Sequence, residues 1–173
     1  IRNMRGTGIF VYGCFSRAEE NQEPLFNSGI GPEFFNLVEG NEIENTGNGI
    51  LILGRNFQPD ADIPSLEKEW NICLGNIVRS NTIRNVRKSG IAIGDEQENI
   101  SGPNHAGTCV EFNYVADARK SGISVAGDTE NTVVRQNHIY CWHTNGSNYP
   151  AVSFHKDAFA FSSDKNEFES NKD

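Results

Sequence analysis

The tetrapeptide RKSG occurs twice in the chain, and the spacing of its charged residues suits the binding of an anionic ligand. Its copies place Arg87 and Lys88 in one turn and Arg119 and Lys120 in another, and Arg5 takes the equivalent position near the N-terminus. Cations held close together repel one another unless an anion lies between them. A uronate or sulfated glycan meets this requirement, because arginine can grip a carboxylate through two parallel hydrogen bonds. Charged turns are also common on protein surfaces, so solvated residues that pair with the surplus acids are the alternative.

Two aspartates form a second candidate pair. Asp95 and Asp128 follow two apolar segments of similar sequence. If these segments are neighbouring strands, the carboxylates lie about 5 Å apart, near the separation in a retaining glycosidase. The offsets differ, because Asp95 is two residues past Ile93 and Asp128 is three past Val125. Aspartate also caps turns at strand ends, which is the alternative role.

Histidine is the third type of candidate. His143 and His155 lie near the last two copies of the repeat described below. Each is a candidate general base or sugar contact, or else a polar ring on the surface. His105 falls in an expected loop and His138 at an outward strand position, so both are weaker candidates.

No cofactor is expected from the sequence. No His/Cys set has zinc spacing, and no Gly-rich phosphate loop opens a helix. Acid-rich stretches at 60–69 and 95–98 offer oxygen ligands for Ca²⁺, but neither matches a spaced calcium loop, so solvated loops are favoured. The four cysteines define no disulfide scaffold. Cys109 falls in an apolar strand slot, which predicts a reduced thiol, and pairing among the other three stays open.

All these residues lie on a sequence repeat. Its template is N-x-V-x-x-N-x-I-x-[ND], a short polar turn, and then G-I-x-[IV]. Alternation with period two predicts short strands, and Asn at a fixed offset predicts bends where Asn side chains stack from copy to copy. The fuller copies span 36–54, 76–94 and 108–127, with partial copies at 1–13, 132–139 and 151–154, and a last one at Asn166, Phe168 and Asn171.

Insertions interrupt the repeat mainly at one corner. Extra loops fall roughly at 14–35, 55–75 and 95–107, whereas in the next copy the extra length moves to 142–150. Loops of this length in a compact repeat protein are usually functional or disordered. Because stacked strands lie about 4.8 Å apart, we expect these loops to form a wall beside the G-I-x-[IV] sheet, with 142–150 facing them across a groove.

The floor of that groove is set by the outward positions of the G-I-x-[IV] strands. It is apolar near the N-terminal copies and small and polar near the C-terminal ones. Phe10 and Tyr12 are candidates for stacking on sugar faces, or else aromatics covered by a loop or partner. The outward set is Phe10, Leu51, Ala92, Ser124 and Ser153, continuing to Tyr12, Leu53, Ala126 and His155.

The template resembles the right-handed parallel β-helix repeat of the pectate-lyase-like superfamily. The resemblance implies an all-β solenoid of about four to five coils, with residues 1–173 as a single segment of a longer solenoid. It also implies an extracellular, cell-surface or periplasmic location.

In similar polysaccharide lyases, Lys and Arg on neighbouring coils serve β-elimination, which needs a base and a cation that stabilises enolate-like charge. Lys88 and Arg119 match those roles; Arg87, Lys120, Tyr12, His143 and His155 are the expected substrate contacts. A β-sandwich would show hairpin turns and no common template.

Composition narrows the function classes. The chain of 173 residues carries a net charge of −8, which argues against a nucleic-acid partner, and no apolar run is long enough to span a membrane. We expect a polysaccharide lyase or glycoside hydrolase that acts on an extended polysaccharide. The alternatives are a non-catalytic glycan-binding, structural or adhesin solenoid, and a fragment with no intact site. Open coil ends expose strand edges, so the remaining coils of a longer chain or a homo-oligomer are the expected protein partners.

Overall fold

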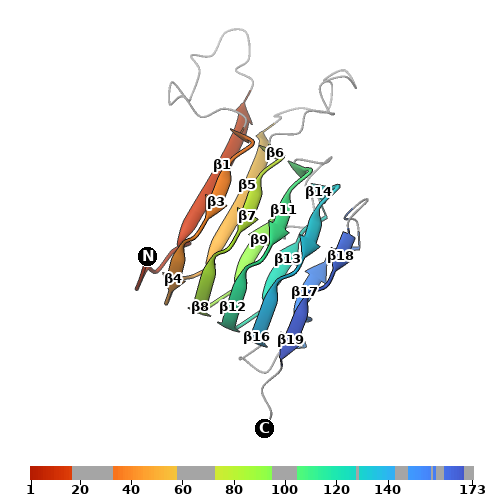
Figure 1. Cartoon of the computed structure of the whole chain (residues 1–173). Helices are drawn as coiled ribbons and strands as arrows, with labels where there is room; N and C mark the ends of the chain where they lie inside the picture. The colour runs from red at the N-terminus through yellow and green to blue at the C-terminus, as the bar shows by residue number, and fades with distance from the viewer. Residues whose placement is uncertain are drawn as a thin grey trace.

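The chain folds into stacked parallel strands in the part that the structure describes. The structure is a computed structural model, and it describes residues 1–16, 33–57, 73–94, 105–127, 129–142, 148–156, 158 and 162–169. These residues are all-β, and every strand pairs in parallel with its neighbours (Figure 1). Within these ranges there is no helix, and hence none that could span a membrane.

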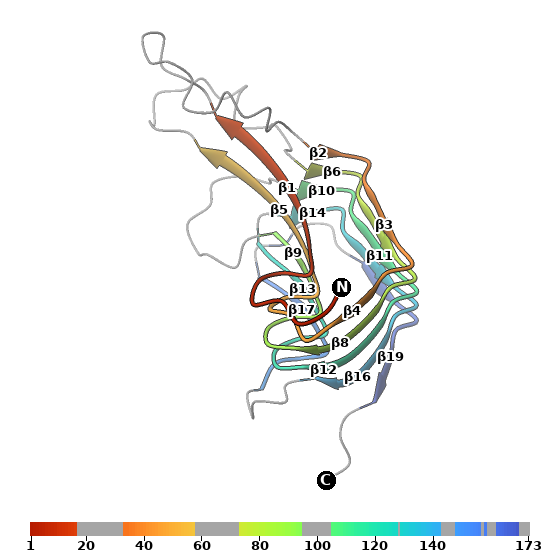
Figure 2. The ribbon, with the colours of Figure 1, turned by 90° about the vertical axis from the view of Figure 1, so that its left-hand side faces the viewer.

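The strands form four sheets, which we number I to IV in chain order. The chain visits the sheets in a fixed order, and each pass lays its strands against those of the previous pass, as in a parallel β-solenoid (Figure 2). Sheet I contains β1 (Ile9–Ser16), β5 (Ile50–Phe57), β9 (Ile91–Ile93), β13 (Ile123–Val125) and β17 (Val152–Phe154). Sheet II contains β2 (Glu33–Phe34), β6 (Cys73–Leu74), β10 (His105–Ala106) and β14 (Thr129–Glu130). Sheet III contains β3 (Leu37–Glu39), β7 (Ile77–Arg79), β11 (Cys109–Glu111), β15 (Val133–Arg135) and β18 (Ser162–Asp164). Sheet IV contains β4 (Glu42–Glu44), β8 (Thr82–Val86), β12 (Tyr114–Ala118), β16 (His138–Trp142) and β19 (Glu167–Glu169).

The strand register confirms the repeat template. The inward isoleucines of sheet I stack from Ile9 through Ile50, Ile91 and Ile123 to Val152. Equivalent columns in sheets III and IV hold the template valines and isoleucines, such as Val78 and Ile83, which are fully buried. Because every pass contributes the same inward slots, the core is one continuous apolar column running along the stack.

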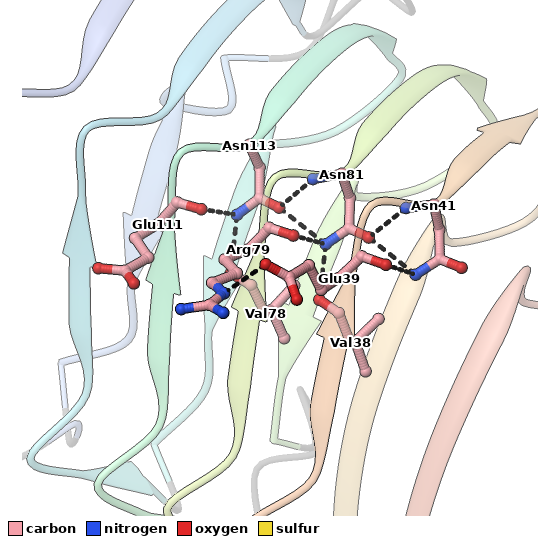
Figure 3. Close-up of polar contacts among 8 residues, drawn as sticks. All are labelled: Val38, Glu39, Asn41, Val78, Arg79, Asn81, Glu111 and Asn113. Carbon is pink, nitrogen blue, oxygen red and sulfur yellow. Dashed lines mark hydrogen bonds and ion pairs between the residues drawn. The ribbon is translucent and has the colours of Figure 1, made fainter.

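The predicted asparagine ladder forms at the bend between sheets III and IV (Figure 3). Asn41, Asn81, Asn113, Asn137 and Asn166 stack in order. From Asn81 on, the side-chain oxygen of each accepts hydrogen bonds from the backbone and side-chain N–H groups of the one before it. The side-chain amides also donate to backbone carbonyls, such as Asn113 Nδ2 to Val78 O at 2.9 Å. The ladder therefore satisfies buried backbone groups where the chain turns.

The left-handed backbone at this bend is not adopted by the ladder asparagines. It occurs one residue earlier, as in Gly40 (φ 67°), Ser80 (φ 54°) and Phe112 (φ 54°). It recurs at the [ND] position of the template, for example at Asn45 (φ 57°) and Asn85 (φ 50°). Asparagine therefore acts as a hydrogen-bonding group at the ladder position and as a turn former only at the [ND] position.

Glycine precedes four of the five strands of sheet I, with Ala151 before β17, because strands and turns approach one another closely there. A Cβ atom on Gly49 would lie 2.5 Å from Gly90 O, and one on Gly90 would lie 2.3 Å from Val115 Cγ1. Both distances are shorter than real Cβ contacts, so a larger residue at either position would force the backbone to shift.

Two expected boundaries are wrong. Strands β1 and β5 continue to Ser16 and Phe57 in a paired register, so the first residues of two expected loops belong to sheet I. Asn166 stacks on Asn137 and Phe168 pairs with Ile139, so the last copy is shifted by one slot from the one predicted. The last residues of the three expected loops are also wrong, because β2, β6 and β10 there form sheet II. The loop residues 17–32, 58–72 and 95–104 lie outside the described residues.

Candidate functional site

A pocket of about 190 Å³ opens on the outer face of sheet I, near the ends of β13 and β17. It lies at the small, polar end of the floor that the sequence predicted. No acidic residue lines it in the described part of the chain. The lining residues are Ser89, Lys120, Ser121, Ser124, Val125, Ala126, Tyr149, Ser153 and His155.

Small residues in one outward column create the hollow. Ala92, Ser124 and Ser153 are paired in register across β9, β13 and β17. The same column holds Phe10 and Leu51 in β1 and β5. The floor therefore changes from large apolar side chains to small hydroxyls along the stack, as predicted, and the pocket forms where the side chains are smallest.

The RKSG turn and a segment from the 142–150 insertion make one wall of the pocket. The Lys120 ammonium lies over the Tyr149 ring, 5.6 Å from its centroid, which is a cation–π distance. The indole N–H of Trp142 donates to the Tyr149 carbonyl at 2.9 Å, so strand β16 holds Tyr149 in place. A cation and an aromatic ring thus share one border of the pocket, where an anionic and partly apolar ligand could contact both.

His155 and Ser121 supply further polar groups to the pocket. His155 follows β17, and its backbone N–H donates to Val125 O at 2.9 Å, which fixes it beside the pocket. Ser121 is 1% exposed, and its hydroxyl has no hydrogen-bond partner among the described residues. A buried hydroxyl without a partner is costly, so a ligand atom that reaches Ser121 would remove that cost.

The structure brings together only part of the predicted site. Lys120 and His155 meet at the pocket. Lys88 and Arg119 are exposed on the stacked turns, where Arg119 N donates to Val86 O at 3.0 Å, but neither lines the pocket. The predicted stacking of the RKSG turns is therefore present in the backbone, whereas the two side chains proposed for catalysis lie outside the cavity.

Arg87 has a structural contact that the sequence did not suggest. One guanidinium nitrogen, Nη2, donates to Met4 O at 2.7 Å and to Arg5 O at 2.6 Å. Arg87 thereby ties the N-terminal turn to the turn two copies further along the stack. These carbonyls already occupy that guanidinium nitrogen, so the predicted role in substrate binding has a competing explanation.

Tyr12 lies far from the pocket. It pairs with Leu53 in sheet I, and its ring centroid is 5.2 Å from that of Phe10. Three strand spacings separate β1 from β13, or about 14 Å at about 4.8 Å per strand. Tyr12 could therefore contact only a ligand that extends along the stack. The candidates Asp95, Asp128 and His143 lie outside the described residues.

An alternating charge ladder on sheet III was missed by the sequence analysis. Arg79 Nε donates to Glu39 Oε1 at 2.7 Å, and Arg135 donates to Glu111 Oε2 through Nε at 2.8 Å and Nη2 at 2.7 Å. The hydrogen bonds to Glu39 and Glu111 raise the pKa of Arg79 and Arg135, respectively. The sequence does carry a signal for this ladder, because the charge of the residue at the fourth template position alternates in sign from copy to copy.

The structure places the two weaker histidine candidates in different environments, one buried and one on the surface. His105 was expected in a loop, but it lies in β10, is fully buried, and accepts a hydrogen bond from Gly54 N at Nε2 (2.9 Å). His138 faces outward as expected and lies 3.7 Å from Glu167 and 3.4 Å from Glu169. His105 thus has a packing role, and His138 belongs to a surface cluster on sheet IV.

The cysteines and metal candidates add no site in the described residues. Cys73, Cys109 and Cys141 form no disulfide there, which confirms the reduced Cys109. Burial is the main cause that raises the pKa of the Cys109 thiol. No group of three His, Cys, Asp or Glu residues within the described ranges could hold a metal ion, and both acidic stretches considered for Ca²⁺ lie outside those ranges.

Comparison with known proteins returned no match among family models, curated proteins or solved structures.

Proposed function

We propose that the chain is a carbohydrate-active segment of a right-handed parallel β-helix similar to the pectate-lyase-like superfamily, with about four to five coils. In this proposal an extended acidic polysaccharide lies along the outer face of sheet I, outside the cell or at its surface. One sugar unit occupies the pocket. The observation that carries the proposal is the meeting of Lys120, Tyr149 and His155 with four serines around one cavity.

Each lining group suits a feature of an acidic sugar. Lys120 is placed to pair with a carboxylate, and Tyr149 is placed to pack against an apolar sugar face. Ser121, Ser124 and Ser153 offer hydroxyls to the sugar's own hydroxyl groups. Tyr12 would contact a unit further along the chain, and Lys88 and Arg119 would attract the carboxylates of neighbouring units.

The lining favours elimination over hydrolysis. A retaining or inverting glycosidase needs a pair of carboxyl groups, and the described lining has none. In β-elimination, His155 would accept the proton α to the sugar carboxylate, while Lys120 stabilises the enolate-like charge. The C–O bond β to the carboxylate then breaks, the leaving oxygen takes a proton from solvent, and a C=C bond forms in the sugar.

A second function is favoured by one observation. Lys88 and Arg119, the residues best matched to lyase catalysis by resemblance, lie outside the pocket. A non-catalytic solenoid that binds acidic glycan in the same place would need only the Lys120 and Tyr149 contacts.

The test is turnover and binding on uronate polymers. We expect ultraviolet absorbance from an unsaturated product, and Lys120→Ala and His155→Ala should abolish it. Lys165→Ala is the matched control, because Lys165 is an exposed lysine directly after β18 and does not line the pocket. If glycan binds and requires Lys120 but yields no product, the binding solenoid is correct. If reducing ends appear without absorbance, the reaction is hydrolysis; if glycan does not bind at all, both functions are wrong.

A further inference from the structure

We infer that His105 is an acid-sensitive latch that holds the end of β5 to sheet II. The neutral imidazole fixes the backbone of Gly54, and a proton taken up by the ring releases it. Acid thereby loosens the β1–β5 end of sheet I and leaves the pocket near β13 and β17 in place. This inference does not depend on the proposed function.

Strand β5 is longer than its neighbour β9 in sheet I. The two strands pair only as far as Ile52 and Ile93, and the last bond of their ladder runs from Gly94 N to Ile52 O at 2.9 Å. Strand β9 then ends, and Gly94 adopts a left-handed backbone (φ 84°) that turns the chain. Strand β5 continues, paired with β1, as far as Ser16 and Phe57 (Figure 2).

The His105 side chain takes the place of the strand that β5 lacks. In a parallel ladder, alternate residues of a strand bond to the same neighbour, so Gly54 is the next donor after Ile52. The Gly54 N–H instead donates to His105 Nε2 at 2.9 Å, in a buried hydrogen bond. A buried amide without an acceptor is costly, so this bond stabilises the end of β5 against sheet II.

The direction of this bond assigns the protonation state of the ring. Nε2 accepts only when it carries no proton, so His105 is neutral with its proton on Nδ1. A second proton would place an N–H at Nε2, facing the N–H of Gly54. It would also create a charge on a side chain that is 0% exposed. The folded latch therefore disfavours the protonated ring, whereas an exposed imidazole takes up a proton at about pH 6.5.

The neighbours of His105 in sheet II offer no negative charge to a protonated ring. Cys73 and Thr129 pair with His105 in register from β6 and β14. Cys73 is fully buried in the apolar core, and a thiol stays neutral in mild acid. The Thr129 hydroxyl donates to Ala126 O at 2.9 Å. Glu130 follows Thr129 in β14, so strand alternation directs it to the opposite face of the sheet.

The sign of the pH effect follows from these contacts. The open form, with its imidazole exposed, binds the proton more readily than the closed form. The stability of the latch is therefore fully present above about pH 6.5 and is lost as the pH falls below that value. Release acts on the apolar end of the floor, because Gly54 pairs with Gly13 directly after the pair of Leu53 and Tyr12.

The experiment follows amide hydrogen exchange and the imidazole nitrogen NMR signals of the full chain. Protection at the Gly54 amide, corrected for the intrinsic exchange rate, should fall about tenfold to thirtyfold from about pH 6.5 to about pH 5, because one coupled proton changes an equilibrium up to tenfold per pH unit. The Ile91 amide, which donates to Gly122 O at 2.9 Å, is the control and should keep its protection. The His105 ring should show the neutral Nδ1–H form as long as Gly54 is protected.

His105→Gln separates the hydrogen bond from the titration. Its amide oxygen can accept from Gly54, and it takes up no proton in this range, so the pH dependence at Gly54 should disappear. If protection still falls as in wild type, the acid effect arises elsewhere and the latch is wrong. If the variant does not fold, wild type alone decides. Protection at Gly54 that stays constant down to about pH 5, or a ring that takes up a proton while Gly54 stays protected, overturns the inference.

Discussion

The side-chain oxygen of Asn81 accepts two hydrogen bonds from Asn41, one from the backbone N–H at 3.0 Å and one from Nδ2 at 2.9 Å. The same geometry recurs at each later step of the ladder. Each asparagine thus depends on the next one for an acceptor. The cost of losing a ladder residue should therefore vary with its position in the stack.

Replacement of a central ladder residue should strongly destabilise the protein. In Asn113→Ala, the buried backbone N–H of Asn81 loses its acceptor, and Val78 O loses the bond from the Asn113 amide. We expect a loss of about 2–4 kcal/mol in the free energy of unfolding, because buried polar groups are left unsatisfied. Chemical denaturation monitored by circular dichroism measures this loss.

Asn41→Ala is the matched control for that experiment. Asn41 is the first member of the ladder in the described chain and provides no acceptor to another ladder asparagine, while its backbone N–H can still donate to Asn81. We expect a loss of less than about 1.5 kcal/mol. Similar losses for the two variants would contradict a directional ladder.

The ion pairs of the charge ladder should stabilise the protein more where they are buried. The Glu111 side chain is 10% exposed and accepts both guanidinium bonds from Arg135, whereas the Glu39 side chain is 42% exposed and accepts one bond from Arg79. We expect Glu111→Gln to lower the denaturant midpoint at least about twice as much as Glu39→Gln, since exposed pairs contribute little. Added salt should reduce the Glu39 effect more than the Glu111 effect. The reverse order would show that burial does not strengthen this pair.

The sequence predicted sheets I, III and IV and their register because apolar residues recur at the inward slots of the template, whereas three strands of sheet II fall within the expected loops. The final copy was misplaced because Ser163 occupies the slot held by valine in the other copies, which removed the apolar signal. The left-handed position before each ladder asparagine carries Gly, Ser, Phe, Gln or Lys, so no shared residue type marks it. Backbone strain there is imposed by the stacked bend and not by local preference.

The pocket was only partly predictable for a different reason. The template placed Ser124, Ser153 and His155 on the outer floor, and the structure confirms their positions in sheet I or directly after it. Tyr149 comes from an insertion with no repeat, and its position depends on the Trp142 hydrogen bond. Spacing within a repeat predicts register, whereas contacts from an insertion depend on tertiary packing.

Alkaline pH should destabilise the protein through Cys109. Burial is the largest cause that raises the pKa of this thiol above its ordinary value of 9.0. A raised pKa in the folded state means that the stabilising contribution is fully present below pH 9.0 and is lost as the pH rises through the folded pKa. We expect the stability of wild type to fall more steeply above pH 9.0 than that of Cys109→Val, which carries the residue found next in the column at Val133.

That comparison isolates one thiol, because Tyr140, whose pKa is also raised, is present in both proteins. Denaturation curves at neutral pH and at several values above pH 9.0 provide the measurement. Parallel curves for the two proteins would mean that the Cys109 thiolate is as well solvated in the folded chain as in the unfolded one.

Arg87 should hold the N-terminal turn in place rather than act only on a ligand. Its guanidinium donates to Met4 O and Arg5 O, and removal of these bonds frees a segment that begins the first pass of the stack. In Arg87→Ala we expect hydrogen exchange at the Gly8 and Ile9 amides, which donate to Asn48 O and Gly49 O, to become about threefold to tenfold faster. Lys88→Ala, a change at the adjacent exposed position, is the control and should leave these rates unchanged. Unchanged exchange in Arg87→Ala, with a loss of glycan binding, would instead assign Arg87 to the ligand.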